Sequence, residues 1–301
     1  MQLLKGWKDR TADKATTLIV RTDAHSGHKL GLQNPDTELW DEDEEGNLEP
    51  YKPELTATQK WLWESYVKHL GAAIEGAGDD GIVLFDLGDL CQGDKYASEL
   101  VSVKDADQVE LALGTFEPFT PYADRIRAIR LLVGTGAHNF GFGSAEVSIL
   151  GRLKNMFPHT DVKLVKHGLF TIGGVAVDAA HHGPGGGSRA WLHGNIVRRY
   201  LQSLMMGEIM AGNEPPGLVL RAHHHVERME TVTLYGGKGQ MWSSAMYIVP
   251  SYCGVTYYAQ KATQSTPTLS IGMLSFRFRN GAIEKRDRFV EVIDLRTKEV
   301  L

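Results

Sequence analysis

Aspartate and histidine side chains follow five apolar runs of the chain, at the points where those runs end. Carboxylate oxygens and imidazole nitrogens together suit divalent transition metals. Two such ions held side by side can deliver a bound hydroxide and clamp a phosphoryl group. The residues are Asp23-Ala24-His25, Gly88-Asp89, His138, His181-His182 and His223-His224-His225. The pattern therefore predicts metal-assisted hydrolysis.

Each group comes directly after a stretch that reads as a short buried β-strand. These stretches are residues 17–20, 82–85, 131–133, 175–177 and 218–220. Open α/β sheets bind ligands beyond the carboxyl ends of their strands. We therefore expect loops at one edge of a sheet to assemble a single site.

In two of the groups, Asp23-Ala24-His25 and His223-His224-His225, the first and third side chains are expected to point the same way. If strand geometry continues through Ala24, Asp23 and His25 face the same way, because side chains alternate along a strand. The same reasoning turns His223 and His225 to one side and leaves His224 pointing elsewhere.

Other positions have a structural as well as a functional interpretation. Asp89 is either a helix N-cap or a metal ligand. Asp86, inside the strand run, is expected to be a supporting carboxylate. Of His181 and His182, one is expected to be a ligand and the other to touch substrate.

Composition narrows the class of protein. The net charge of -5 and the isoelectric point near 6.2 give no basic footprint for gripping duplex nucleic acid. Two cysteines are too few for a disulfide framework and favour a reducing compartment. The first residues lack a signal peptide, and no run reaches the roughly 20 apolar residues of a membrane span. We expect a soluble cytoplasmic protein without a membrane partner.

Strand and helix patterns alternate in the first half of the chain, and strands dominate the last third, which predicts a mixed-sheet α/β fold. One domain over residues 1–301 is expected, with a polar acidic insertion loop at 27–57 and a mostly β part at 227–301. Helices are predicted over 58–73, 105–113, 121–128, 144–155 and 188–210. Strands are predicted over 17–22, 82–87, 130–133, 162–166, 169–172, 174–180, 217–221, 229–234, 246–249, 269–278 and 288–294.

The ordered set of motifs resembles the calcineurin-like metallophosphoesterase family over roughly residues 17–226. The family pattern is D-x-H, G-D, G-N-H-D/E, a histidine and G-H-x-H, in that order. The resemblance, to a family that includes phage and prophage members, implies a four-layer α/β/β/α sandwich of two mixed β-sheets. It also implies two divalent ions (Mn, Fe, Zn or Ni) and hydrolysis of a phosphate ester, either a phosphodiester of nuclease type or a phosphomonoester.

The resemblance assigns a role to each matching residue. Asp23, His25 and His225 match the ligands of the first ion, and Asp89 matches the carboxylate that bridges both ions. For the second ion, His181 and His223 match the ligands, and the family pattern favours His181 over His182. His138 matches the histidine that stabilises charge or protonates the leaving group, with Asn139 placed to orient it.

The third motif departs from the family pattern. The chain reads Gly134-Thr135-Gly136-Ala137-His138-Asn139, so the usual asparagine ligand is missing from its place. With Gly134 as the family glycine, Thr135 takes the place of the asparagine. With Gly136 aligned instead, Ala137 takes it and Asn139 replaces the acid. Thr135 and His182 are therefore candidates for additional metal or substrate contacts.

Two classes of function follow. The first is a metal-dependent phosphoesterase acting on a phosphate-ester substrate, for which nucleic acid remains open. The second, supported by the altered third motif, is a metal-binding scaffold or interaction protein with weakened catalysis. The oligomeric state and the metal identity stay open.

Overall fold

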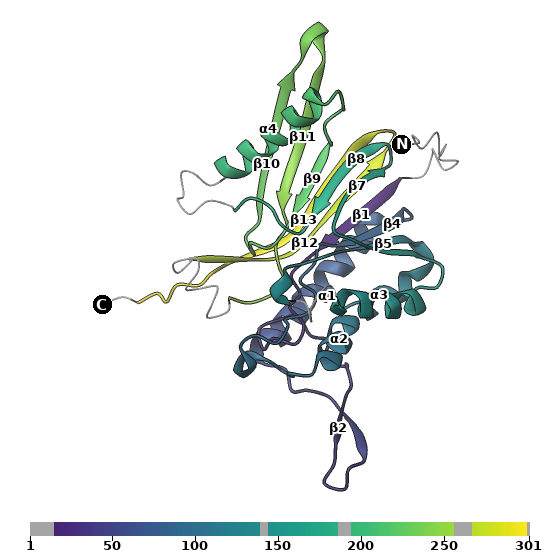
Figure 1. Cartoon of the computed structure of the whole chain (residues 1–301), viewed down its shortest axis with the longest axis vertical. Coiled ribbons are helices and arrows are strands. Elements are labelled where there is room, and N and C mark those ends of the chain that lie inside the picture. Colours follow the sequence, from purple (N-terminus) through teal and green to yellow (C-terminus); the bar gives the residue numbers. More distant parts are fainter. Residues whose placement is uncertain (1–14, 139–143, 186–193, 256–266, 300–301) are drawn as a thin grey trace.

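Two mixed β-sheets lie face to face, and helices cover the outer face of each (Figure 1). The computed structural model describes residues 15–138, 144–185, 194–255 and 267–299. The four layers are α1–α3, a six-stranded sheet, a five-stranded sheet and α4. The predicted α/β/β/α sandwich is therefore confirmed.

The six-stranded sheet has the order β13-β12-β1-β4-β5-β6. The four neighbouring strands β1, β4, β5 and β6 run parallel to one another. Strand β12 is antiparallel to β1, and β13 is antiparallel to β12. The bounds are β1 Thr16–Arg21, β4 Gly81–Asp86, β5 Ile126–Leu132, β6 Asp161–Val165, β12 Thr268–Arg279 and β13 Ala282–Asp294.

The five-stranded sheet has the order β10-β11-β9-β8-β7. Here β8, β9 and β11 are parallel, and β7 and β10 are antiparallel edge strands. The predicted turn at Gly173-Gly174 joins β7 to β8, and both glycines have positive φ. The bounds are β7 His167–Ile172, β8 Val175–Ala180, β9 Leu218–Arg221, β10 Arg228–Tyr235 and β11 Met241–Ile248.

Successive side chains of β1 alternate between the two cores of the sandwich. Leu18 and Val20 face the second sheet and pack with residues such as Val177 and Leu218, whereas Ile19 faces the helices. All three β1 side chains are fully buried. The strand is apolar on both faces, as expected for a parallel strand that is covered on both sides.

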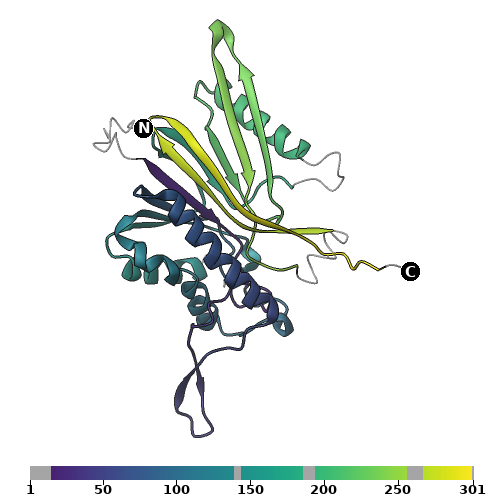
Figure 2. The same cartoon turned by 180° about the vertical axis from the view of Figure 1, so that it is seen from behind.

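Three helices cover the six-stranded sheet and one covers the other (Figure 2). The helix α1 begins after a capping box of Thr56 and Gln59 and buries Leu62, Tyr66 and Leu70. On the opposite side of the molecule, α4 packs through Val197, Leu201 and Met205. The bounds are α1 Ala57–Ala77, α2 Asp105–Gly114, α3 Ser144–Met156 and α4 Asn195–Met210. Part of the helix predicted over 188–210 lies outside the described residues.

The helix predicted over 121–128 is wrong. A 3₁₀ segment, η2, spans Glu117–Arg125, and β5 begins at Ile126, earlier than the predicted 130–133 strand. Parallel pairing with β4 and β6 draws residues 126–132 into the sheet. Tertiary pairing thus overrides the local helical pattern.

The segment predicted as a polar insertion loop at 27–57 has two parts. In the first part, residues such as Gly27, Leu32 and Asn34 are buried. The remainder forms a hairpin of β2 Leu39–Glu42 and β3 Leu48–Tyr51. This hairpin stands away from the layers, and its acidic side chains are largely exposed (Figure 1).

Among the described residues, no helix combines the length and apolar character needed to cross a bilayer.

Candidate metal centre

The predicted ligands leave the carboxyl ends of five parallel strands and meet between the two sheets. Asp23 and His25 follow β1, Asp89 follows β4, and Thr135 follows β5. From the second sheet, the loop after β8 supplies His181 and the loop after β9 supplies His223, His224 and His225. The structure thus brings the residues of all five predicted motifs to one place.

The backbone at this place is held in an unusual conformation. Of the seven non-glycine residues with positive φ in the described part of the chain, five are predicted ligands. These are Asp23, His25, Asp89, His223 and His225, with φ between 45° and 75°. Such left-handed conformations are uncommon for these side chains and cluster at functional sites.

The left-handed residues also correct the reasoning from alternation. Strand β1 ends at Arg21 and β9 at Arg221, so no strand geometry continues through Ala24 or His224. Tight loops, not β pleating, aim the paired side chains. His224 does point elsewhere, because its Nε2 donates a hydrogen bond to the Gly183 carbonyl over 3.2 Å.

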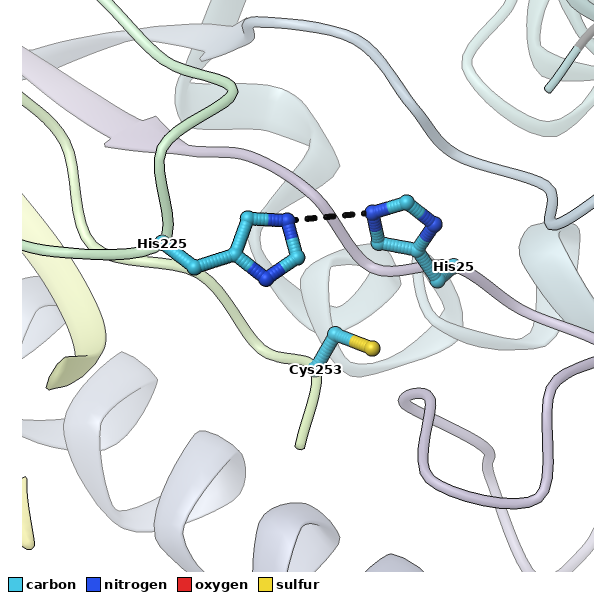
Figure 3. A group of neighbouring side chains, drawn as sticks. All are labelled: His25, His225 and Cys253. Atoms are coloured by element: carbon cyan, nitrogen blue, oxygen red, sulfur yellow. Dashed lines mark hydrogen bonds between the residues drawn. The ribbon is translucent and has the colours of Figure 1, made fainter. Parts of the chain in front are cut away.

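One group of donors surrounds the Asp23 carboxylate. Nε2 of His25 lies 3.2 Å from Nε2 of His225, and the two rings face each other (Figure 3). The Oδ1 atom of Asp23 lies 3.2 Å from Nε2 of His225 and 3.7 Å from Nε2 of His25. Two facing ring nitrogens beside a carboxylate oxygen form a donor set suited to one transition-metal ion.

A second group of donors gathers around Oδ2 of Asp89. That oxygen lies 3.0 Å from Nε2 of His181 and 4.0 Å from Nδ1 of His223. The Thr135 hydroxyl lies 2.8 Å from it, 3.2 Å from Nε2 of His181 and 3.3 Å from Nδ1 of His223. Thr135 therefore stands where an additional oxygen ligand is needed, which favours the alignment that starts at Gly134.

Asp89 belongs to both groups. One carboxylate oxygen of Asp89 and one ring nitrogen each of His25 and His138 all lie within 4.8 Å of one another. The same holds for one carboxylate oxygen each of Asp89 and Asp23 and one ring nitrogen of His181. A shared carboxylate between two donor sets is the arrangement that a dinuclear centre requires.

Hydrogen bonds on the far side of the His25 and His181 rings determine which ring nitrogen can bind a metal ion. Nδ1 of His25 donates to Oε1 of Gln92 over 3.0 Å, and Nδ1 of His181 donates to the Leu87 carbonyl over 2.8 Å. In each neutral ring the Nε2 lone pair then faces the centre. Such outer contacts orient metal-binding histidines. Gln92 was not predicted, since nothing in the sequence marks an amide three residues after Asp89.

Two glycines make room for Asp89. A Cβ on Gly134 would lie 2.1 Å from Oδ1 and 2.4 Å from the backbone nitrogen of Asp89. Gly88 has φ of +109°, and a Cβ there would lie 2.8 Å from Cα of Gly134. The Thr135 N–H donates to Oδ1 of Asp89, so the loop after β5 packs closely against this carboxylate and hydrogen-bonds to it.

Charge at the centre is unbalanced. Asp23 and Asp89 are buried, and within the described ranges their ion pairs all join histidines. Burial opposes ionisation, but neighbouring histidines hold the pKa of both carboxyls well below the usual range. Burial lowers the pKa of His25 to about 4. The His181 ring, whose pKa is raised to about 9, lies beside Asp89 and balances one of these two buried carboxylates, and divalent ions would compensate the remaining charge.

His138 lies beside the first group of donors. It ends the 3₁₀ segment η3, Gly136–His138, and its ring packs edge-on against His25 with 4.6 Å between centroids. Its Nδ1 donates to the Gln92 carbonyl over 2.6 Å, so Nε2 is free to face a substrate. Asn139 lies outside the described residues.

His182 sits at the exposed rim of the centre. Its ring centroid lies 5.0 Å from those of both His181 and His223. Burial and the neighbouring His181 lower its pKa. A neutral imidazole at this rim can donate or accept a hydrogen bond from a bound molecule.

A separate hollow of about 540 Å³ lies between α2, α3 and the segment before the hairpin, and none of the predicted ligands lines it. Its lining includes Glu38, Glu110 and Glu117, and its arginine, Arg152, is paired with Glu110 over 2.6 Å. The acidic lining does not suit a phosphate group.

Comparisons with known proteins found similarities to solved structures at low sequence identity. The chain matches no protein-family profile and no curated protein. Among solved structures it is similar to an archaeal phosphodiesterase, with 11% identity, 92% of this chain and 99% of that chain covered, and a TM-score of 0.39. It is also similar to a calcineurin-like phosphoesterase of Bacillus subtilis, with 11% identity, 93% and 91% coverage, and a TM-score of 0.38. A protein of unknown function from Aquifex aeolicus has 11% identity, 71% and 81% coverage, and a TM-score of 0.30.

Proposed function

We propose that the chain is a metal-dependent phosphoesterase of the calcineurin-like class, with two divalent ions held between its sheets. The observation that carries this proposal is the position of Asp89, whose carboxylate is shared by the two donor groups. Asp23, His25 and His225 would hold one ion, and Thr135, His181 and His223 would hold the other. When bound, the ions would neutralise the phosphate charge and activate water.

The protein residues contribute orientation and proton transfer. His25 and His181 are fixed by Gln92 and the Leu87 carbonyl, so their lone pairs are preorganised. The Nδ1 N–H of His138 is committed to the Gln92 carbonyl, so in the doubly protonated imidazolium form the ring would present its second proton, on Nε2, to the leaving oxygen. His182 at the rim would contact the phosphate or its substituent.

The scaffold alternative loses its support. It depended on the missing asparagine of the third motif, and the Thr135 hydroxyl lies among the second group of donors. We therefore favour a complete second site with a hydroxyl in place of an amide. The substrate is a phosphate ester, and whether it is a diester or a monoester is decided by assay.

The test combines metal analysis with hydrolysis of a chromogenic phosphodiester and the corresponding monoester. Chelation should remove activity, and Mn²⁺, Zn²⁺, Fe²⁺ or Ni²⁺ added separately should restore it. Asp89→Asn should lower the occupancy of both ions and remove activity, whereas Asp79→Asn, an exposed turn position, should match the unmodified protein. Two bound ions without hydrolysis of either ester would favour the scaffold; full activity after complete chelation would contradict the proposal.

A further inference from the structure

Cys253 belongs to a sixth loop at the same edge of the sandwich. It follows β11, which runs parallel to β9. On one side the Tyr252 N–H donates to the carbonyl of Asp23, a member of the first donor group, over 3.2 Å. On the other side the Gly254 N–H donates to the Leu30 carbonyl, in the segment that follows His25, over 2.8 Å. The position of Cys253 is therefore fixed relative to Asp23.

The thiol of Cys253 lies with the ring nitrogens of the first donor group. Its Sγ atom, one nitrogen of His25 and one of His225 all lie within 4.8 Å of one another. In Figure 3 the Cys253 side chain rises from its loop toward the two facing imidazole rings. Zinc binds sulfur at about 2.3 Å and nitrogen at about 2.0–2.1 Å, so the three donors are spaced on the scale of one coordination sphere.

The surroundings of this cysteine differ from those of an ordinary core position. Cys253 is fully buried, and no hydrogen bond joins its sulfur to any residue in the part of the chain that the structure describes. Burial raises the pKa of the thiol, and the charges of Asp23 and Asp89 raise it further. The sulfur is thus an unpaired buried donor beside two carboxylates and two imidazoles.

We propose that Cys253 provides a sulfur ligand to the ion held by Asp23, His25 and His225. This inference rests on the proposed metal centre. As the metal–sulfur bond forms, the S–H bond breaks and its proton passes to solvent, with no change of oxidation state. Thiolate ligands favour Zn²⁺ and similar soft or borderline ions, whereas carboxylates suit Mn²⁺. The first site should therefore prefer zinc over manganese.

X-ray absorption of the zinc-loaded full chain tests the ligand directly. The unmodified protein should show a sulfur shell at about 2.3 Å in addition to nitrogen and oxygen at about 2.0–2.2 Å. Cys253→Ser should lose the sulfur shell while retaining zinc. Cys91→Ser is the matched control, because Cys91 is also buried but its thiol donates to the Gln108 carbonyl; its sulfur shell should persist.

Competition between zinc and manganese tests the selectivity. Zinc affinity at the site of Asp23, His25 and His225 should fall in Cys253→Ser by more than the roughly 10–100-fold that is lost with an outer contact. Manganese affinity should fall less, and Cys91→Ser should change neither. Bound zinc with only nitrogen and oxygen neighbours in the unmodified protein would overturn the sulfur ligand and leave the metal centre standing. Absence of any bound metal would overturn both.

Discussion

At the scale of single residues, the centre is defined by backbone conformations that its side chains rarely adopt. Each left-handed residue costs about 1–3 kcal/mol, and five predicted ligands hold such conformations. The hydrogen bonds that lock the loops together offset this cost, among them Asp23 N–H to the Gly88 carbonyl and His25 N–H to the Asp89 carbonyl, both 3.0 Å. The donors are therefore positioned by the protein before any ion arrives.

His138 is predicted to act on the substrate and not as a ligand. Its Nδ1 donates to the Gln92 carbonyl and its ring packs edge-on against His25, and the resemblance to the family assigns this histidine to the leaving group. His138→Ala should retain both ions and lose about 10²- to 10⁴-fold in turnover, the range of general acid–base catalysis. Metal content and turnover on a chromogenic phosphodiester are measured together. A loss of bound metal in this variant would show instead that His138 is a ligand.

The second site should bind its ion more tightly as pH rises. Burial opposes protonation of His181, but its hydrogen bond to Asp89 and the nearby carboxylates raise its pKa to about 9. In the metal-free protein this ring is therefore protonated at neutral pH, and an ion must displace the proton. Affinity at this site should rise by up to about tenfold per pH unit until about pH 9, and it should level off at higher pH, because the proton is then already lost. Metal titrations at pH 6, 7 and 8 check the slope, and equal affinities would contradict it.

At the scale of elements, the centre depends on strand ends more than on strand pattern. The order of apolar runs and polar residues was sufficient to predict a mixed-sheet α/β fold and the meeting of five loops, whereas the second sheet was implied by the resemblance to the family. It could not give the loop conformations, because Asp23-Ala24-His25 follows a left-handed turn that alternation does not describe. It also missed Cys253, although this residue follows the end of β11 as the ligands follow theirs. The other groups were recognised because Asp and His recur after apolar runs, whereas a single cysteine after a proline-containing loop does not belong to that pattern.

Thr135 is the residue that distinguishes the second site from the family pattern. Thr135→Val keeps the shape of the side chain and removes the hydroxyl, so it should weaken only the second step of a metal titration. Thr135→Asn should strengthen that step, and Ala137→Asn should leave it unchanged, because Gly134 places residue 135 among the donors. Strengthening by Ala137→Asn alone would support the alignment that starts at Gly136.

At the scale of the whole molecule, the proposed ions join the two sheets. Asp23, His25 and Asp89 come from the six-stranded sheet, and His181 and His223 come from the five-stranded sheet. An ion at 100 times its Kd stabilises the folded state by about 2.7 kcal/mol. Loading with zinc should therefore raise Tm by several degrees. Calorimetry checks this, and Asp89→Asn should show a much smaller rise; an equal rise in that variant would mean that zinc binds elsewhere.

The β2–β3 hairpin, by contrast, contacts the body mainly at its base, where Leu39 is buried. Its tip residues Glu44 and Glu45 are exposed, and Lys104 joins it to the body through Asp41 over 3.0 Å at the surface. Exposed surface pairs of this kind contribute little to the stability of a fold, and tips of such hairpins tolerate insertion. The turn at Gly46 is accordingly a natural attachment point: a fluorescent label or an anchoring peptide placed there would let the molecule be tracked or immobilised with its metal centre undisturbed.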